Sequence, residues 1–324
     1  MTKRNFRQAF NAVFHDKEMF EDFLSIDIGD EIERVVISNK LKKQQRVIFK
    51  QSDRLKKYLR FVDRVILRSL ARNDDVVHSF TKDKSTLTAV IAHAKNDFFF
   101  QTDISSFYSS ITKNDVLMLL KRDVDLVPIS DLSDYLEFLA SVMTYDNTLP
   151  IGFSTSPQIS NAFLFEFDRQ LNDICREREI IYTRYADDII LSSMTLNVLE
   201  DMSHVIDSLL SELFSGNISL NRDKTKLIRK GNKIKILGLT ILPNGIVTID
   251  RKHKNTIETL LYLYTTDIEK FHEHLSMMDG FNQRSLFGLL HYANSVDPHY
   301  ISKLQRKYGA LAVHKLMEDS QNDD

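Results

Sequence analysis

The sequence predicts an α+β protein built around an antiparallel sheet, and three observations favour this class. Short apolar runs in the middle of the chain have the length and β-branched content of strands, and acidic residues stand at their ends. A strongly basic segment precedes them, and a helical region follows over about residues 252–317. With 324 residues, the chain is long enough for a large core and two or three subdomains.

The composition excludes several classes of protein. A single cysteine, Cys175, rules out an internal disulfide framework and a cysteine-based zinc site. No apolar run reaches membrane-spanning length, and the first residues lack the apolar core and cleavage site of a signal peptide. We therefore expect a cytoplasmic protein without a membrane partner.

The formal net charge of −2 conceals a strong local asymmetry. Residues 40–72 contain twelve Lys or Arg and two acids, which gives this segment a charge of +10, and residues 222–235 contain seven cations and one acid. Such separation indicates a face that meets a polyanion. A solvated helix face is the alternative. The high density of cations in 40–72, with only two acids among them, favours nucleic acid as the partner of this segment.

Periodicity places the elements along the chain. Apolar residues at helical spacing predict helices at 5–24, 53–70, 85–93, 113–121, 131–144, 158–178 and 197–213, and over most of 252–317. Short β-branched and aromatic runs predict strands at 32–37, 46–49, 98–104, 218–220, 227–228, 234–241 and 246–249, and a short extended segment at 76–80. Pro243–Gly245 reads as a turn, and 149–157, with two Pro, one Gly and three Ser or Thr, reads as a loop.

The stretch 181–193 predicts a β-hairpin whose tip carries Asp187 and Asp188 between two apolar runs. Adjacent carboxylates at the tip of a buried hairpin are unfavourable unless a cation neutralises them, and a divalent metal does so. A solvated Asp-Asp turn is the alternative for this stretch taken alone.

A second strand, 98–104, delivers Asp103 near its end. If this strand neighbours the hairpin in one antiparallel sheet, three carboxylates share a small volume and repel one another unless cations are bound. Two Mg²⁺ ions about 3.5–4 Å apart are the usual solution in polymerases and nucleases. Hard oxygen donors and the absence of a His/Cys cluster favour Mg²⁺, with Mn²⁺ as an alternative, over zinc.

Five motifs then occur in order, and their spacing carries a resemblance. They are Gln101–Tyr108 (QTDISSFY), Leu149–Pro157 (LPIGFSTSP), Tyr185–Asp188 (YADD), Leu220–Thr225 (LNRDKT) and Ile236–Leu239 (ILGL). Together they resemble the successive palm motifs of reverse transcriptases of the bacterial retron and defence-associated (antiphage) type. The similarity covers about residues 40–310. One YxDD is a weak signal, whereas five motifs in order are specific.

The resemblance implies a right-hand polymerase fold with fingers, an antiparallel-sheet palm and a helical thumb. It implies an N-terminal helical extension at 1–30, fingers and palm at 31–250, and a helical thumb with an acidic tail at 251–324. The implied activity is RNA-directed DNA polymerisation from dNTPs to a DNA product, with a structured non-coding RNA as template or scaffold. The implied setting is antiphage defence, with a second defence protein or a homo-oligomer as a further partner.

Residue roles follow from the same resemblance. Asp103 and Asp187 would be the principal metal ligands, with the Ile104 carbonyl helping and Asp188 in the same cluster. Lys224 would protonate or steady pyrophosphate, its alternative being a solvated lysine in a basic turn. The nucleotide would meet Arg46, Ser106, Phe107, Tyr108, Ile151 and Gly152. The nucleic acid would meet Ser154, Thr155, Ser156, Pro157, Tyr185, Leu237 and Gly238. The Tyr108 ring would clash with a 2′-hydroxyl and so select deoxynucleotides, although a core aromatic is compatible with the same position.

The chain also departs from the family pattern. Ile151 stands where the family usually has a Gln that contacts the incoming nucleotide, and Ile236–Gly238 replaces a Val-Thr-Gly. Thr88–His93 replaces an Asn-Ala-x-x-His element. These departures favour a defence-associated relative over a strict retron enzyme. Because Ile151 lacks the amide of that Gln, template-independent or protein-primed DNA synthesis is a second hypothesis. A catalytically silent RNA-binding subunit is the third, and the presence of all three acids argues against it.

Overall fold

The structure, a computed structural model, describes residues 3–39, 44–231 and 233–318. Lys40, Lys42 and Lys43 of the basic segment, and the expected acidic tail at 320–324, lie outside the described residues. The chain divides into two compact units: Met1–Lys84 with Phe98–Ile228, and Ser85–Asp97 with Arg229–Asp324. Among the described helices, none has the length and apolar character needed to cross a membrane.

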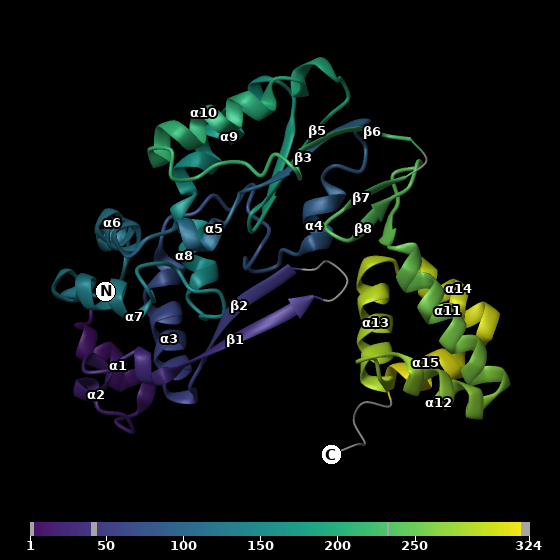
Figure 1. The fold of residues 1–324 in the computed structure, drawn as a ribbon, viewed down its shortest axis with the longest axis horizontal. Helices are drawn as coiled ribbons and strands as arrows, with labels where there is room; N and C mark the ends of the chain where they lie inside the picture. Colours follow the sequence, from purple (N-terminus) through teal and green to yellow (C-terminus); the bar gives the residue numbers. More distant parts are fainter. Residues whose placement is uncertain (1–2, 40–43, 232, 319–324) are drawn as a thin grey trace. The chain divides into compact units, whose positions relative to one another are not determined.

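The first unit carries the larger sheet (Figure 1). Its strands are β1 (Ile32–Asn39), β2 (Gln44–Gln51), β3 (Phe98–Asp103), β4 (Ile181–Tyr185), β5 (Asp188–Ser193) and β6 (Lys226–Arg229), the last ending at the unit boundary. Its helices are α1 (Phe6–Phe14), α2 (Phe20–Leu24), α3 (Asp53–Val65), α5 (Phe107–Ser110), α6 (Lys113–Asp123), α7 (Leu136–Val142), α8 (Ser156–Phe163), α9 (Phe165–Glu177) and α10 (Met202–Phe214). Short 3₁₀ turns lie at Gly29–Glu31, Leu67–Ser69, Val124–Leu126, Leu132–Tyr135 and Asn197–Leu199.

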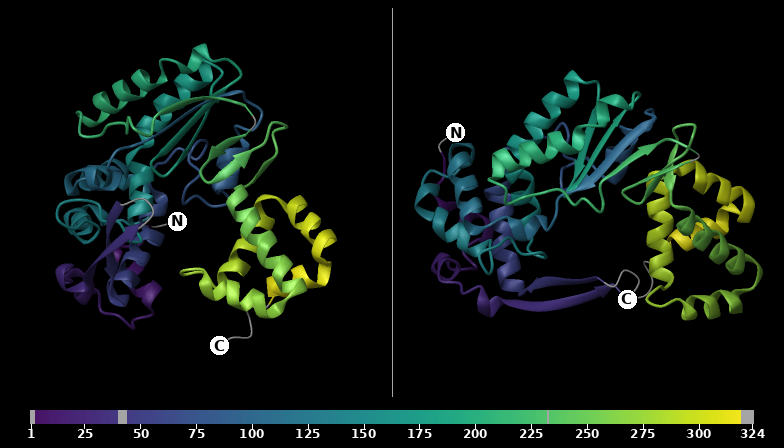
Figure 2. Two further views of the ribbon diagram at one scale, coloured as in Figure 1. Left: turned by 45° about the vertical axis from the view of Figure 1, so that its right-hand side comes forward. Right: turned by 45° about the horizontal axis from the view of Figure 1, so that its top comes forward.

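Four of these strands form one sheet in the order β4-β5-β3-β6, and β5 runs antiparallel to both β3 and β4. Helices α9 and α10 lie along this sheet (Figure 2). Helix α9 packs on β4 and α10 and buries Phe167, Leu171 and Cys175 completely. The apolar stripe of α9 therefore fixes the position of the hairpin formed by β4 and β5.

Strands β1 and β2 form a separate two-stranded ribbon that leads into α3. The Ser52 hydroxyl caps α3 by accepting a hydrogen bond from the Leu55 amide at 3.0 Å. The N-terminal helices pack on α3 through aromatic rings, since the Phe6 and Phe10 centroids lie 5.7 and 5.3 Å from that of Phe61. The N-terminal residues thus belong to the core of the first unit.

The second unit consists of a small antiparallel sheet, one short helix beside it and a helical bundle. Its elements are α4 (Thr86–Ile91), β7 (Ile234–Ile236), β8 (Leu239–Ile241), β9 (Val247–Ile249), α11 (Arg251–Thr266), α12 (Ile268–Met277), α13 (Gln283–Val296), α14 (Pro298–Tyr308) and α15 (Ala310–Glu318). Helix α4 packs on β8 and β9, which explains why 85–97 joins this unit.

Several predicted elements differ in the structure. The helix expected at 5–24 is two helices, α1 and α2, and the strand expected at 218–220 is an isolated bridge between Leu220 and Ile104. The strand expected at 234–241 is two strands, because Leu237 and Gly238 both adopt positive φ (48° and 81°) and form a two-residue hairpin turn. The single helix expected at 158–178 is interrupted at Leu164, between α8 and α9. Residues 76–80, expected to be extended, contain a single parallel bridge between Val77 and Arg184, followed by a bend. Apolar residues continue through Leu164 and Leu237, so the apolar pattern gave no sign of the breaks at these two positions.

Candidate active site

The pairing of β3 with β5 brings the predicted acids together. Asp103 is the register partner of Asp188, and the Ile104 amide donates to the Asp187 carbonyl at 3.1 Å. The sequence prediction that the strand of Asp103 neighbours the hairpin of Asp187 and Asp188 matches this pairing. The acids lie in the first unit, at one end of its sheet.

The side chain of Asp103 is the most enclosed of the three acids, with the residue 3% exposed. Its Oδ2 accepts a hydrogen bond from Lys224 Nζ at 2.6 Å, while its Oδ1 is buried without a hydrogen-bond partner. A buried carboxylate oxygen without a partner is unfavourable. The free Oδ1 therefore marks a place where a cation or donor would be stabilised.

Backbone contacts to β3 hold the turn that carries Lys224. The Asn221 amide donates to the Asp103 carbonyl at 2.8 Å, and the hydroxyls of Thr102 and Thr225 lie 2.7 Å apart. These contacts place the turn directly beside Asp103. Contacts between this turn and β3 therefore hold Lys224 within reach of Asp103.

Burial and mutual repulsion perturb the acids at the hairpin tip. Burial, followed by the charges of Asp187 and Asp103, raises the pKa of Asp188 to about 6. Burial also raises the pKa of Asp187, and the charges of Lys224 and Arg46 oppose this shift. The pKa of Lys224 is raised, chiefly by its hydrogen bond to Asp103. The site therefore has an excess of negative charge that cations stabilise.

The donor set fits a hard divalent cation. Carboxylate oxygens and a nearby backbone carbonyl are ligands that Mg²⁺ and Mn²⁺ accept, and Asp103 Oδ1 is available. Within 3–39, 44–231 and 233–318, no three acidic, His or Cys side chains already converge as a metal cage. Lys224 instead supplies the positive charge at Asp103 in this structure.

Tyr108 lies near the acids, on α5. Helix α5 begins after Ser106, which adopts a left-handed conformation (φ 49°), and Phe107 is buried beside the Tyr108 ring. Burial raises the pKa of Tyr108, a hydrogen bond with Ser160 lowers it, and the charge of Asp187 raises it further. Tyr108 is thus both a partly buried aromatic and a neighbour of the proposed metal ligands.

Strand β2 holds the loop that carries Ile151 and Gly152. The Phe49 amide donates to the Ile151 carbonyl at 2.9 Å, and Gln51 Nε2 donates to the Gly152 carbonyl at 2.7 Å. Gly152 has φ 112°, and a Cβ added there would lie 2.5 Å from the Phe49 carbonyl oxygen. The close approach that requires glycine is therefore to β2. The side chain of Ile151 projects outward, with the residue 42% exposed.

The rest of this loop mixes satisfied and unsatisfied groups. Ser156 Oγ donates to the Pro150 carbonyl at 2.7 Å, and the Pro157 carbonyl accepts from Ser160 Oγ at 2.8 Å. The Ser154 and Thr155 hydroxyl oxygens are buried without hydrogen-bond partners. Ser156 and Pro157 are thus hydrogen-bonded within the protein, whereas the hydroxyl groups of Ser154 and Thr155 could still form a hydrogen bond.

The remaining predicted residues are more scattered. Arg46 is exposed on β2, and its charge lowers the pKa of Asp187. Tyr185 is the register partner of Asp188 across the hairpin. Leu237 and Gly238 form the turn between β7 and β8 in the second unit, whereas the acids belong to the first unit.

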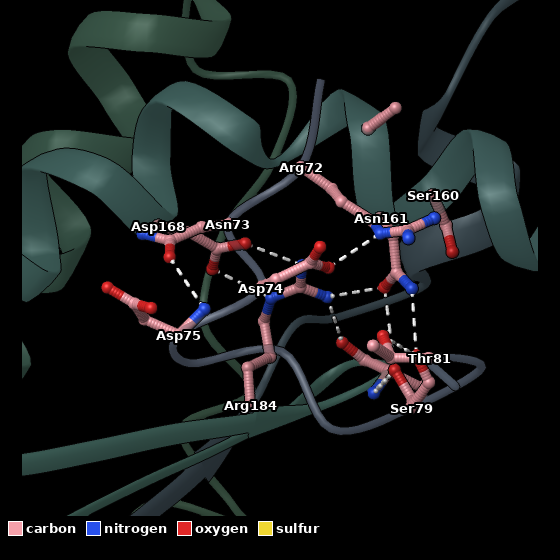
Figure 3. A network of polar contacts seen from close by, with 12 residues as sticks. Arg72, Asn73, Asp74, Asp75, Ser79, Thr81, Ser160, Asn161, Asp168 and Arg184 are labelled. Carbon is pink, nitrogen blue, oxygen red and sulfur yellow. Dashed lines mark hydrogen bonds and ion pairs between the residues drawn. The ribbon is translucent and has the colours of Figure 1, made fainter. Parts of the chain in front are cut away.

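A buried polar network beneath the hairpin was not predicted (Figure 3). Arg184 and Asp168 form an ion pair with both side chains fully buried, and Asn161 and Ser79 continue the network. An arginine inside the strand 181–185, whose other residues are uncharged, was the available signal, because a buried guanidinium requires a carboxylate partner.

Comparison with known proteins identifies the class. Residues 34–241 match the reverse transcriptase (RNA-dependent DNA polymerase) family. The chain is 30% identical to the retron Ec73 reverse transcriptase of Escherichia coli over 244 residues, covering 72% of this chain and 74% of that protein. It is 25% identical to the retron Ec83 reverse transcriptase of Escherichia coli over 284 residues, covering 85% and 86%.

The chain therefore belongs to the reverse transcriptase family, and it is a bacterial retron-type member. It is an RNA-directed DNA polymerase, which copies an RNA template with dNTPs and depends on divalent metal as the family does. A structure of apo telomerase from Candida tropicalis aligns with a TM-score of 0.50 at 11% identity, covering 88% of this chain and 60% of that one. This likeness concerns the fold, and the predicted α+β right-hand polymerase fold is confirmed.

Proposed function

We propose that the reverse transcriptase activity resides at Asp103, Asp187 and Asp188, where two divalent cations bind with help from the Ile104 carbonyl. The observation that carries this proposal is the register pairing of Asp103 with Asp188, together with the unpartnered Asp103 Oδ1. Mg²⁺ suits the all-oxygen donor set, and Mn²⁺ would substitute. Cations held there would activate a primer hydroxyl and neutralise the departing pyrophosphate.

The side chains around the acids take complementary roles. Lys224, hydrogen-bonded to Asp103, would donate to the leaving pyrophosphate. The Tyr108 ring would exclude a 2′-hydroxyl, and Arg46, exposed and electrostatically coupled to Asp187, would meet the triphosphate. Ser106, Phe107, Ile151 and Gly152 would shape the nucleotide site. Ser154, Thr155, Ser156, Pro157 and Tyr185 would meet the nucleic acid, as would Leu237 and Gly238 of the second unit.

The domain roles belong to the same proposal. Residues 31–250 would form fingers and palm, 251–324 the thumb with its acidic tail, and 1–30 the N-terminal extension. The exposed cations of α3, among them Lys56, Arg60 and Arg64, would hold nucleic-acid backbones by charge.

The biological setting is proposed from the retron relatives and from the motif resemblance. We infer a role in antiphage defence, with a structured non-coding RNA as template or scaffold. A second defence protein, or a further copy of this chain, would complete the system. Deleting the gene from its host should then increase phage plaque formation. Equal plaque numbers with and without the gene, across a panel of phages, would contradict the defence role.

A direct test of the site uses incorporation of labelled dNTPs on a defined RNA template with Mg²⁺. Asp187→Asn and Asp103→Asn should lower incorporation by several orders of magnitude and weaken Mn²⁺ binding, measured from the electron paramagnetic resonance (EPR) signal of free Mn²⁺. Asp173→Asn is the matched control, because Asp173 is an exposed acid on α9. Wild-type incorporation by Asp187→Asn would show that the acids are wrongly assigned.

Sequencing the product separates the alternatives. A product complementary to the RNA supports templated synthesis. A product that forms without RNA, or that stays attached to protein, indicates template-independent or protein-primed synthesis. A wild-type protein that binds RNA but never incorporates dNTPs would indicate a silent binding subunit.

A further inference from the structure

We propose that Arg184 is a positioning residue, which sets the orientation of Asp187 through the backbone of Ala186. The inference rests on the proposed metal site at Asp187. It assigns a role in that site to a side chain that lies beneath the hairpin, within a buried network formed by Arg184, Asp168, Asn161 and Ser79 (Figure 3).

The base of this network is a fully buried ion pair. Arg184 Nε donates to Asp168 Oδ1 at 2.8 Å and Arg184 Nη2 donates to Asp168 Oδ2 at 2.6 Å, with both side chains 0% exposed. Two parallel bonds of this kind hold the guanidinium plane in one orientation. The Tyr182 hydroxyl also donates to Asp168 Oδ1, at 2.7 Å. The guanidinium is therefore anchored to Asp168 of α9.

The third guanidinium nitrogen acts on the hairpin tip. Arg184 Nη1 donates to the Ala186 carbonyl at 2.9 Å and to Asn161 Oδ1 at 3.2 Å. On the other side of the same residue, the Ala186 amide donates to Ser79 Oγ at 2.8 Å. Both backbone polar groups of Ala186 are thus held by side chains that are themselves part of the buried network.

The remaining members stabilise each other. Asn161 Nδ2 donates to the Ser79 carbonyl at 2.9 Å, and the His78 amide donates to the Arg184 carbonyl at 2.9 Å. These bonds connect α8, the 76–80 segment and β4. A displacement of the Ala186 peptide would therefore break hydrogen bonds on several elements at once.

The consequence for Asp187 follows from covalent geometry. The Ala186 carbonyl belongs to the peptide plane that ends at the Asp187 Cα, so fixing this carbonyl fixes the Asp187 N–Cα bond. The Ile104 amide donates to the Asp187 carbonyl at 3.1 Å and holds the peptide plane on the other side. With both planes held, the direction in which the Asp187 side chain leaves the turn is set. Ala186 has φ 55°, a left-handed conformation that is unfavourable for a residue with a Cβ. The two external hydrogen bonds hold this conformation.

Stability alone is a weak explanation for the buried pair. Replacing such a pair with apolar side chains of similar volume is often neutral or stabilising, because the desolvation of two charges offsets their attraction. The planar Arg184 guanidinium donates hydrogen bonds both to Asp168 of α9 and to the Ala186 carbonyl. An apolar side chain could not make this link between α9 and the residue before Asp187. Misplacing a reacting group by about 1 Å lowers rates by about 100-fold.

The test removes both charges together, so that no unpaired charge remains buried. The double variant Asp168→Leu/Arg184→Met is compared with the wild type in three measurements: thermal unfolding, kcat for dNTP incorporation, and Mn²⁺ affinity by EPR. We expect an unfolding temperature close to that of the wild type, a kcat at least tenfold lower, and a severalfold weaker Mn²⁺ affinity. Tyr182→Phe is the control, because it removes a bond to Asp168 without touching Ala186, and its kcat and Mn²⁺ affinity should stay at wild-type values.

A folded double variant with wild-type kcat and Mn²⁺ affinity would overturn the proposal. If the double variant does not fold, Arg184→Lys decides, since it keeps a positive charge for Asp168 but lacks the planar fork that also donates to the Ala186 carbonyl. Reduced kcat and weaker Mn²⁺ binding in folded Arg184→Lys would support the proposal, and wild-type values would refute it. If Asp187→Asn is inactive while these variants are normal, the positioning role alone fails. If Asp187→Asn is active, the site assignment fails first.

Discussion

Lys224 Nζ lies 2.6 Å from Asp103 Oδ2, so an ammonium neutralises the most buried acid of the cluster in this structure. The side chain of Lys224 is 57% exposed, whereas that of Asp103 is 5% exposed. The lysine is therefore able to leave more readily than the carboxylate. Its charge both stabilises the cluster and opposes the binding of other cations to Asp103.

Lys224→Met should separate these two effects. Removing the ammonium leaves Asp103 less neutralised, so we expect Mn²⁺ to bind as tightly as in the wild type or more tightly. Loss of a donor to pyrophosphate should lower kcat by about 100-fold or more. Lys226→Met, an exposed lysine on β6, is the control. Weaker Mn²⁺ binding in Lys224→Met would show instead that the lysine only holds Asp103 in place.

The sequence predicted that the strand of Asp103 could neighbour the hairpin of Asp187 and Asp188, because antiparallel pairing leaves few arrangements for these strands. The catalytic role of the three acids stays a prediction. The resemblance places Gly152 at the nucleotide, whereas the close approach that the structure shows at Gly152 is to another part of the backbone. The identity of the approaching backbone, that of Phe49, depends on a contact between distant segments and could not be read from local pattern.

The buried network was not predicted for a related reason. Asp168 lies on a helix that carries several other charged residues, such as Glu166 and Arg169, and Ser79 lies in a segment that was expected to be extended. Neither residue shows by spacing that it serves Arg184. The ion pair becomes evident only when α9 is packed on β4.

Metal binding should weaken as the pH falls through about 6. Burial and neighbouring charges raise the pKa of Asp188 to about 6, so the neutral carboxyl persists to higher pH than in an ordinary aspartate. Because only the ionised form binds a cation well, Mn²⁺ affinity should be highest above this pH and decline below it. EPR titrations between about pH 5 and 8 would measure the change. An affinity independent of pH over this range would contradict the raised pKa.

Tyr108 should control the choice of sugar. Tyr108→Ala removes the ring, so we expect ribonucleotide incorporation relative to deoxynucleotide incorporation to rise by at least tenfold. Tyr108→Phe keeps the ring and loses only the hydrogen bond with Ser160, and its selectivity should stay close to that of the wild type. The measurement is kcat/KM for matched ribonucleotide and deoxynucleotide pairs. Equal discrimination in the wild type and Tyr108→Ala would exclude a steric role for the ring.

Ile151→Gln should change nucleotide selection without a large change in stability. The side chain is exposed and the loop backbone is held by Phe49 and Gln51, so a substitution there should alter the free energy of unfolding by less than about 0.5 kcal/mol. Because a glutamine amide can hydrogen-bond an incoming nucleotide and an isoleucine cannot, we expect a severalfold lower KM for the correct dNTP and a lower frequency of misincorporation on RNA. Ile151→Met is the matched control, since it retains an apolar side chain of similar size. If Ile151→Gln and Ile151→Met gave the same KM and misincorporation frequency, the amide would have no role at this position, and selection would depend on other groups around Tyr108 and Gly152.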